Sequence, residues 1–140
     1  MSTSGLAVLD HTVQETNVWL KAVGEQLQLD RHDAYIALRA VLHALRDRLP
    51  PEVAVHLGAQ LPMLIRGLYY EGWHMAGKPT KDRHVEEFAE RIMQELPPQF
   101  PLDPLTVARG VFETLWERLD PGEFEKLMHH LPTSLRSLRT

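Results

Sequence analysis

Residues 33–68 read DAYIALRAVLHALRDRLPPEVAVHLGAQLPMLIRGL, and residues 103–138 read DPLTVARGVFETLWERLDPGEFEKLMHHLPTSLRSL. When the second stretch is placed on the first at an offset of 70 without gaps, 12 of the 36 positions carry the same residue. Unrelated sequences of this length share only a few positions. Similarity at a fixed offset is the signature of an internal repeat, so the chain is predicted to contain two similar halves.

Both stretches carry apolar residues three and four positions apart, which is the spacing of one face of an α-helix. These faces comprise Tyr35, Leu38, Val41, Leu42, Leu45 and Leu49 in the first stretch, and Leu105, Ala108, Val111, Phe112, Leu115 and Leu119 in the second. No segment alternates apolar and polar residues as a half-buried strand does. The sequence therefore predicts an all-α fold of about six to eight helices. Each half is too small to bury a large core, so we expect the halves to pack face to face as a pseudo-twofold pair, with these two helices at the centre.

The first half, about residues 12–71, is predicted to begin with a helix. The sequence Thr12-Val13-Gln14-Glu15 has the form of a capping box, in which two side chains bind free backbone N–H groups at a helix start. This predicts a helix from Thr12 to about Leu29, with an apolar face made of Trp19, Leu20, Val23 and Leu27. A second helix begins near residues 30–33 and stops at Pro50-Pro51, because proline cannot continue a helix.

Residues 82–140 are predicted to repeat this plan. Their first helix has an apolar face made of Val85, Phe88, Ala89, Ile92, Met93 and Leu96. Asp103-Pro104 and Asp120-Pro121 each place a capping acid before a proline at the first helical position. Pro62 and Pro132 occupy the same position in the two halves. Pro132 is predicted to open the last helix, and Pro62 to divide residues 53–70 into two short helices or one kinked helix.

Residues 72–81 lack a helical pattern and are predicted to form the linker between the halves. Trp73 in this linker needs a place for its large apolar surface. Trp73 either folds back between the halves or stays exposed as an anchor for a partner. Arg66 either lays its stem over the core or joins the neighbouring aromatic residues in a binding surface. The candidate interaction residues are Arg66, Tyr69, Tyr70, Trp73, Lys78 and Pro79.

Eight histidines are the one compositional excess of the chain. A metal or haem site would need several of them to converge with a carboxylate. The weak candidates, chosen by helical spacing, are His74, His84, Glu87, Glu125 and His129. A site built by the repeat would recur in both halves, and these positions do not. Solvated or capping histidines are therefore the favoured interpretation, and neither a metal nor a cofactor is predicted.

Composition excludes several classes of function for this chain of 140 residues, which we treat as a single domain over residues 1–140. Its net charge of −4 argues against a nucleic-acid partner, and the absence of cysteine excludes thiolate chemistry. No nucleophile motif or complete phosphate loop is present, so no catalytic residue is predicted. The apolar stretch 61–70 is too short to span a membrane, and residues 1–10 do not form a signal peptide. A cytoplasmic location is expected.

The stretch Arg66-Gly67-Leu68-Tyr69-Tyr70-Glu71-Gly72-Trp73, followed by Lys78-Pro79 and His84-Val85-Glu86-Glu87-Phe88, resembles the bacterial domain of unknown function 2267. The segments Leu38-Arg39-Ala40-Val41-Leu42, Arg48-Leu49-Pro50 and Ala59-Gln60-Leu61-Pro62 are similar to it as well. The resemblance covers most of the chain. Members of that family are small helical proteins with no assigned activity, so the resemblance implies the fold class and no catalytic residue.

These observations favour a non-enzymatic helical module that acts through its surface, by binding a protein partner or by self-association as a homo-oligomer. The alternative is a binder of a small ligand, metal or haem that uses the histidines and the cleft between the two halves. A small enzyme is the least favoured hypothesis.

Overall fold

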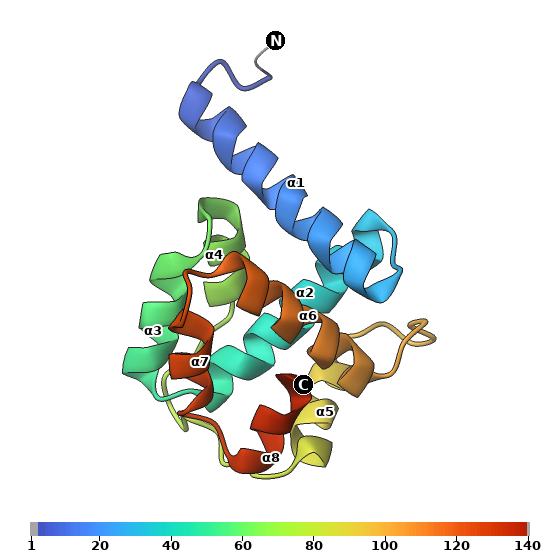
Figure 1. Cartoon of the computed structure of the whole chain (residues 1–140), viewed down its shortest axis with the longest axis vertical. Coiled ribbons are helices and arrows are strands. Elements are labelled where there is room, and N and C mark those ends of the chain that lie inside the picture. The colour runs from blue at the N-terminus through green and yellow to red at the C-terminus, as the bar shows by residue number, and fades with distance from the viewer. Residues whose placement is uncertain (1–2, 140) are drawn as a thin grey trace.

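The helical spacing of the apolar residues produces eight α-helices and no strand in the computed structural model, which describes residues 3–139 (Figure 1). The helices are α1 (Ala7–Leu27), α2 (Arg31–Arg48), α3 (Pro51–Gln60), α4 (Met63–Tyr70), α5 (Val85–Gln94), α6 (Pro104–Arg118), α7 (Glu123–Met128) and α8 (Thr133–Arg136), followed by a 3-10 turn at Ser137–Arg139. The predicted all-α fold is confirmed.

Acidic caps and prolines fix several of the helix ends. The side chain of Asp30 accepts a hydrogen bond from Asp33 N at the start of α2. The side chain of Asp103 accepts hydrogen bonds from Leu105 N and Thr106 N at the start of α6. Its hydrogen bonds with Thr106 lower the pKa of its carboxyl. Pro62 separates α3 from α4, so residues 53–70 form two short helices rather than one kinked helix.

The start of α1 differs from the prediction. The helix begins at Ala7, five residues before Thr12, and the capping box at Thr12 does not form because this residue lies inside the helix. A set of contacts earlier in the chain lies at the start of the helix instead. The hydroxyl of Ser4 accepts a hydrogen bond from Leu6 N and donates one to the Asp10 carboxylate, at 3.1 and 2.8 Å.

The start of α7 is the second difference. Asp120 does not cap this helix; its backbone carbonyl accepts a hydrogen bond from Glu123 N and forms a turn. Gly122 is the residue before the helix and has a φ angle of 83°, a conformation that glycine adopts without steric cost. The chain therefore turns at Gly122 before the helix begins.

Tyr35 and Met93, which were expected on buried faces, lie at the edges of those faces and are exposed.

One cluster of buried side chains joins residues from all eight helices. Helices α2 and α6 contact each other, and both contact α1 and α5. They therefore lie near the centre of the fold, as their matching apolar faces predict. The pseudo-twofold relation of the halves stays a prediction.

The first turns of α1 project from the rest of the molecule (Figure 1), and every described residue before Thr12 is exposed except the half-buried Asp10.

Candidate functional site

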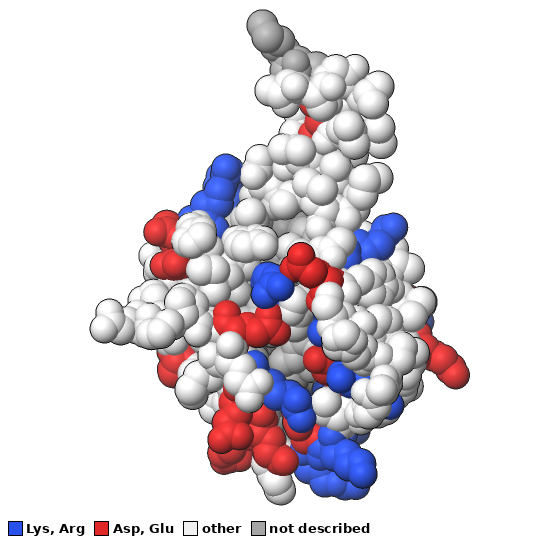
Figure 2. All heavy atoms as spheres, turned by 180° about the vertical axis from the view of Figure 1, so that it is seen from behind, with Lys and Arg blue, Asp and Glu red and all other residues white. Residues whose placement is uncertain are grey.

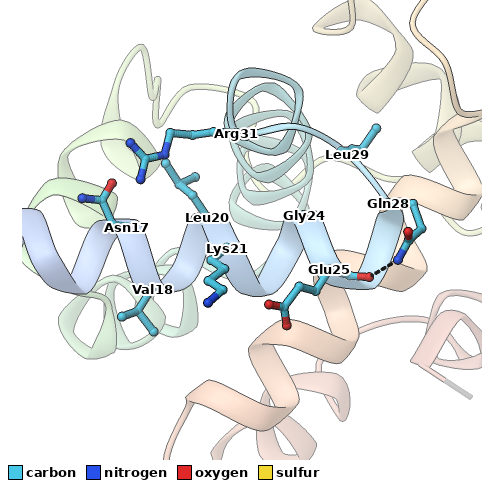
Figure 3. A pocket seen from close by; sticks show the side chains of 9 residues that line it. All are labelled: Asn17, Val18, Leu20, Lys21, Gly24, Glu25, Gln28, Leu29 and Arg31. Atoms are coloured by element: carbon cyan, nitrogen blue, oxygen red, sulfur yellow. Dashed lines mark hydrogen bonds between the residues drawn. The ribbon is translucent and has the colours of Figure 1, made fainter.

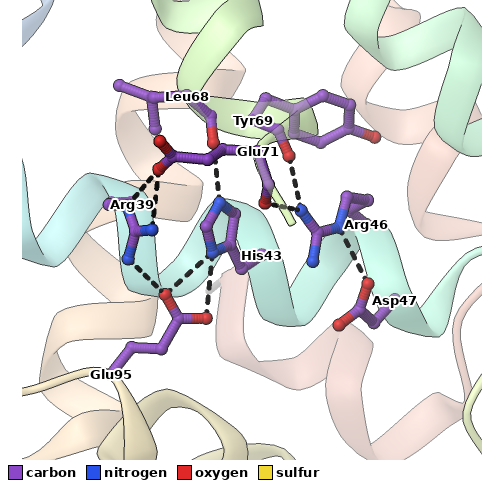
Figure 4. A network of polar contacts seen from close by, with 8 residues as sticks. All are labelled: Arg39, His43, Arg46, Asp47, Leu68, Tyr69, Glu71 and Glu95. Atoms are coloured by element: carbon purple, nitrogen blue, oxygen red, sulfur yellow. Dashed lines mark hydrogen bonds and ion pairs between the residues drawn. The ribbon is translucent and has the colours of Figure 1, made fainter. Parts of the chain in front are cut away.

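A row of basic side chains on α2 faces the end of α4 (Figure 4). Arg39, His43 and Arg46 follow one another at spacings of four and three, so they lie on one side of the helix. The apolar residues of α2 follow the same spacing of three and four. This spacing is the signal from which the row of basic residues could have been predicted. His43 and Arg46 were not predicted as members of a network, because their partners are distant in the chain.

His43 is 4% exposed and uses both of its ring nitrogens. Its Nδ1 lies 2.8 Å from a carboxylate oxygen of Glu95, which follows α5, and its Nε2 lies 2.6 Å from the backbone oxygen of Leu68 in α4. Both ring nitrogens therefore have hydrogen-bond partners, and His43 joins α2 to the end of α5 and to α4.

The two arginines complete the network. Arg39 donates to the carboxylates of Glu71 and Glu95, each at 2.8 Å. The hydrogen bond with Glu71 raises the pKa of Arg39 and lowers the pKa of Glu71. Arg46 is buried and donates to the backbone oxygens of Tyr69 and Glu71, at 2.8 and 2.9 Å. Carbonyl groups at a helix C-terminus lack partners within the helix, so cations placed there stabilise the end of α4.

The predicted interaction residues of α4 hold this helix against α3. Tyr69 is buried, and its hydroxyl donates to Ala54 O at 2.6 Å; burial raises the pKa of this phenol. Tyr70 donates to Val55 O at 3.3 Å. Arg66 donates to Leu61 O and to Gly58 O, both at 2.9 Å, at the end of α3.

The predicted residues after α4 are half-buried. Trp73 stacks on Tyr70, with 5.6 Å between ring centroids and 27° between ring planes. This contact covers part of its apolar surface, while its Nε1 is buried without a hydrogen-bond partner among the described residues. Lys78 and Pro79 lie just before Thr80, whose backbone N–H donates to Asp47 O at 2.8 Å. This bond ties the predicted linker to α2.

The five weak metal candidates do not converge. His74 is exposed in the loop after α4, whereas Glu87 accepts hydrogen bonds from Arg83 N and His84 N at the start of α5. These bonds lower the pKa of Glu87. Glu125 and His129 line a separate hollow of about 280 Å³ on α7. Within residues 3–139, no three His, Cys, Asp or Glu side chains lie close enough together to hold a metal ion.

A cleft of about 250 Å³ lies between α3 and α7. His56 Nε2 lies 3.1 Å from the carboxylate of Glu123, and this hydrogen bond lowers the pKa of Glu123. Gln60 donates to the same carboxylate, while its own Oε1 is buried without a partner in the described chain. His130 also lines the cleft. Histidines were expected in a cleft between the halves, but His56 and His130 were not among the candidates. The repeat aligns Gln60 with His130 and His56 with Lys126, so the four residues occupy two pairs of equivalent positions.

A larger hollow of about 620 Å³ lies along α1 and the turn that leads to α2 (Figure 3). The figure shows Arg31 and Asn17 on one edge of the helix and Lys21 and Glu25 on the other. The hollow is open to solvent and mixes both charges, so its charge does not select a ligand class. No helix in the described part of the chain is long and apolar enough to cross a bilayer.

The fold and its contacts define a small all-helical protein whose buried charged groups hold helices together. Residues 16–138 match the model of a family described as "Uncharacterized conserved protein (DUF2267)", and the chain belongs to this family. The resemblance found in the sequence is thereby confirmed. None of the curated proteins compared with the chain matches it.

Proposed function

We propose that this protein is a non-enzymatic helical module that acts by protein contact through the first turns of α1. We call residues 3–13 the arm. The observation that carries the proposal is the apolar surface of the arm, where Leu6, Val8, Leu9 and Val13 are 58%, 59%, 40% and 44% exposed. Contiguous apolar side chains on an element that projects from the fold are typical of a binding surface.

The arm differs in charge from the rest of the molecule. Figure 2 shows a nearly uncharged arm above a body that carries many acidic and basic side chains. The first 20 residues contain neither lysine nor arginine. Nucleic acids and anionic membranes are bound largely through such cations, so an apolar protein surface is the better match for the arm.

The polar groups of the fold support a non-enzymatic role. His43 is buried with both ring nitrogens engaged, and Arg39 and Arg46 bind carboxylates and carbonyl groups at the end of α4. These contacts give the buried charged groups of the network a role in supporting the fold.

Photo-cross-linking in cells tests the proposal. A photoreactive amino acid at Leu9 should give a cross-linked protein product, whereas the same amino acid at Gln14 should not. Gln14 is an exposed polar residue of α1 that lies off the apolar face, so it serves as the matched control. Equal or absent products at the two positions would contradict the proposal.

A second candidate function is small-ligand binding in the cleft between α3 and α7. The observation in its favour is the buried Oε1 of Gln60, which lacks a hydrogen-bond donor among the described residues. A small amine or amide would supply one. We expect such compounds to shift the backbone NMR signals of Val53, Gln60 and Leu127, and a screen of amines and amides that leaves all three unchanged would exclude this function.

A further inference from the structure

We propose that the cleft between α3 and α7 binds the alkylammonium group of a small free amine, and that it selects this cation over neutral and anionic compounds of the same size. The inference rests on the second candidate function, because it names the ligand class of that cleft. It follows from the hydrogen-bond acceptors of the cleft, from its charge and from its apolar wall.

Glu123 supplies the charged acceptor of the cleft. Its Oε2 lies 3.1 Å from His56 Nε2 and 3.3 Å from Gln60 Nε2. Its Oε1 lies 3.8 Å from Lys126 Nζ, which is too long for a hydrogen bond. The side chain of Glu123 is 23% exposed, so solvent and a ligand can reach it. Within the described residues, Glu123 thus keeps one oxygen that can accept a hydrogen bond from a ligand.

Gln60 supplies a second, neutral acceptor. Its Oε1 is buried and has no donor within residues 3–139, which costs free energy relative to a paired carbonyl group. Its Nε2 donates to Glu123 at 3.3 Å and to His56 O at 3.4 Å, and bonds of this length let the carboxamide turn toward a ligand. A primary ammonium carries three N–H donors and no acceptor, so it can serve Glu123 and Gln60 at once.

The charge of the cleft favours a cation. Two carboxylates, those of Glu52 and Glu123, line it together with one ammonium, that of Lys126. The hydrogen bond from His56 lowers the pKa of Glu123, so this carboxyl stays ionised at neutral pH. The side chain of Lys126 is 77% exposed and interacts mainly with water. An anionic ligand would therefore meet like charges, whereas a cation would meet the opposite charge.

The size and the apolar wall of the cleft limit the ligand further. Val53 and Leu127 line the cleft beside its polar groups and offer a surface to an alkyl chain. The volume is about 250 Å³, slightly below the range of about 300–1,000 Å³ that holds drug-sized ligands. These features together fit a short alkylammonium ion.

Four probes of similar size test the selectivity by NMR at pH 7. Butylammonium chloride should shift the backbone signals of Val53, Gln60 and Leu127 with a dissociation constant of about 1–10 mM. Butyramide, which is neutral, should bind at least about fivefold more weakly. Sodium butyrate, and sodium chloride at the same ionic strength, should leave the three signals in place. Shifts of equal size with sodium chloride would overturn the inference.

Two pairs of variants locate the binding group. Lys126→Met removes a cation that competes for Glu123, so it should tighten butylammonium binding about twofold or more, whereas Lys81→Met, an exposed lysine outside the cleft, should not. Glu123→Gln should weaken binding at least about fivefold, and Glu125→Gln, on the same helix but outside the cleft, should change it less than about twofold. Weaker binding in Lys126→Met would overturn the inference even if Glu123→Gln failed to fold.

The outcomes separate this inference from the function on which it rests. Equal affinities for butylammonium and butyramide would overturn the selection of a cation and leave small-ligand binding in place. Unchanged signals with every probe would overturn both. Because the side chain of lysine also ends in a butylammonium group, N-acetyl-lysine amide is a further probe. If it bound as tightly as butylammonium or more so, the site would accept a lysine of a partner protein, and the assignment to a free amine would be overturned.

Discussion

Arg66 and Arg136, which are 70 residues apart, make equivalent hydrogen bonds in the two halves of the chain. Each donates to the backbone oxygen five residues earlier, Leu61 and Leu131, at 2.9 Å. Each also donates to the oxygen seven residues earlier, at 3.4 and 3.5 Å. The repeated arginine therefore satisfies carbonyl groups where one helix ends and the next begins, which explains why both halves carry it.

Replacing the guanidinium of Arg66 should destabilise the protein moderately. Arg66→Met retains the apolar stem but removes the guanidinium donors to Leu61 O and Gly58 O, which should cost about 1–2 kcal/mol in the free energy of unfolding. Arg109→Met is the matched control, because Arg109 is exposed on α6 and makes no hydrogen bond or ion pair with the described residues. Urea unfolding of both variants measures the difference. Equal losses would show that the hydrogen bonds of Arg66 contribute nothing.

His43 and Glu95 should stabilise the fold as a coupled pair. His43→Leu removes the imidazole that contacts Glu95 and Leu68 O, and should cost about 2 kcal/mol or more in the free energy of unfolding. A double-mutant cycle with Glu95→Gln isolates the pair, and we expect a coupling energy of about 1–2 kcal/mol. Additive effects of the two substitutions would contradict the direct contact.

Acid should weaken the ion pair between Arg39 and Glu71. A carboxyl whose pKa is lower in the folded chain contributes stability above its unfolded value, and this contribution is lost as the pH falls through the folded value. The pKa of Glu71 is lowered from 4.5 by the hydrogen bond from Arg39. Stability should therefore decline as the pH falls below about 4.5.

Arg39→Gln provides the test of this pH dependence. It removes the cation that lowers the pKa of Glu71, so the free energy of unfolding should fall less steeply between about pH 5 and pH 3 than in the natural chain. Arg109→Gln, which removes one exposed arginine without breaking a described contact, should keep the natural slope. Urea titrations at a series of pH values measure both slopes, and a steeper decline in Arg39→Gln would have the wrong sign.

A methyl group at Gly110 should disturb the packing of α1 on α6. A Cβ atom there would overlap the side chain of Leu27, so Gly110→Ala should cost about 1–3 kcal/mol. Gly67→Ala is the control, because a Cβ in that helix would meet no atom within 4 Å. It should leave the protein equally stable or up to about 1 kcal/mol more stable, since alanine favours the helix. Thermal unfolding distinguishes the two, and a neutral Gly110→Ala would contradict the close approach of α1 and α6.

Local features of the sequence determined most of the helices. The cap at Asp103 and the break at Pro62 appear where the sequence predicts them, and α2 starts within the predicted residues 30–33, because a cap or a proline acts on backbone groups within a few residues. The same local reasoning was wrong at Thr12, where a second set of contacts at Ser4 begins the helix earlier. It was also wrong at Asp120, where Gly122 turns the chain first.

The tertiary structure alone decided how distant polar groups pair and which apolar faces are covered. His43 and Glu95 are 52 residues apart and meet only because α2 packs against α5. Likewise, apolar residues recur at helical spacing along α1, yet Leu6 and Leu9 are exposed because the rest of the fold ends before it reaches them. Helix formation depends on residues that are neighbours in the chain, so sequence spacing predicts it. The pairing of distant polar groups and the burial of an apolar face depend on which surfaces the whole fold brings together. Sequence spacing carries little information about those contacts.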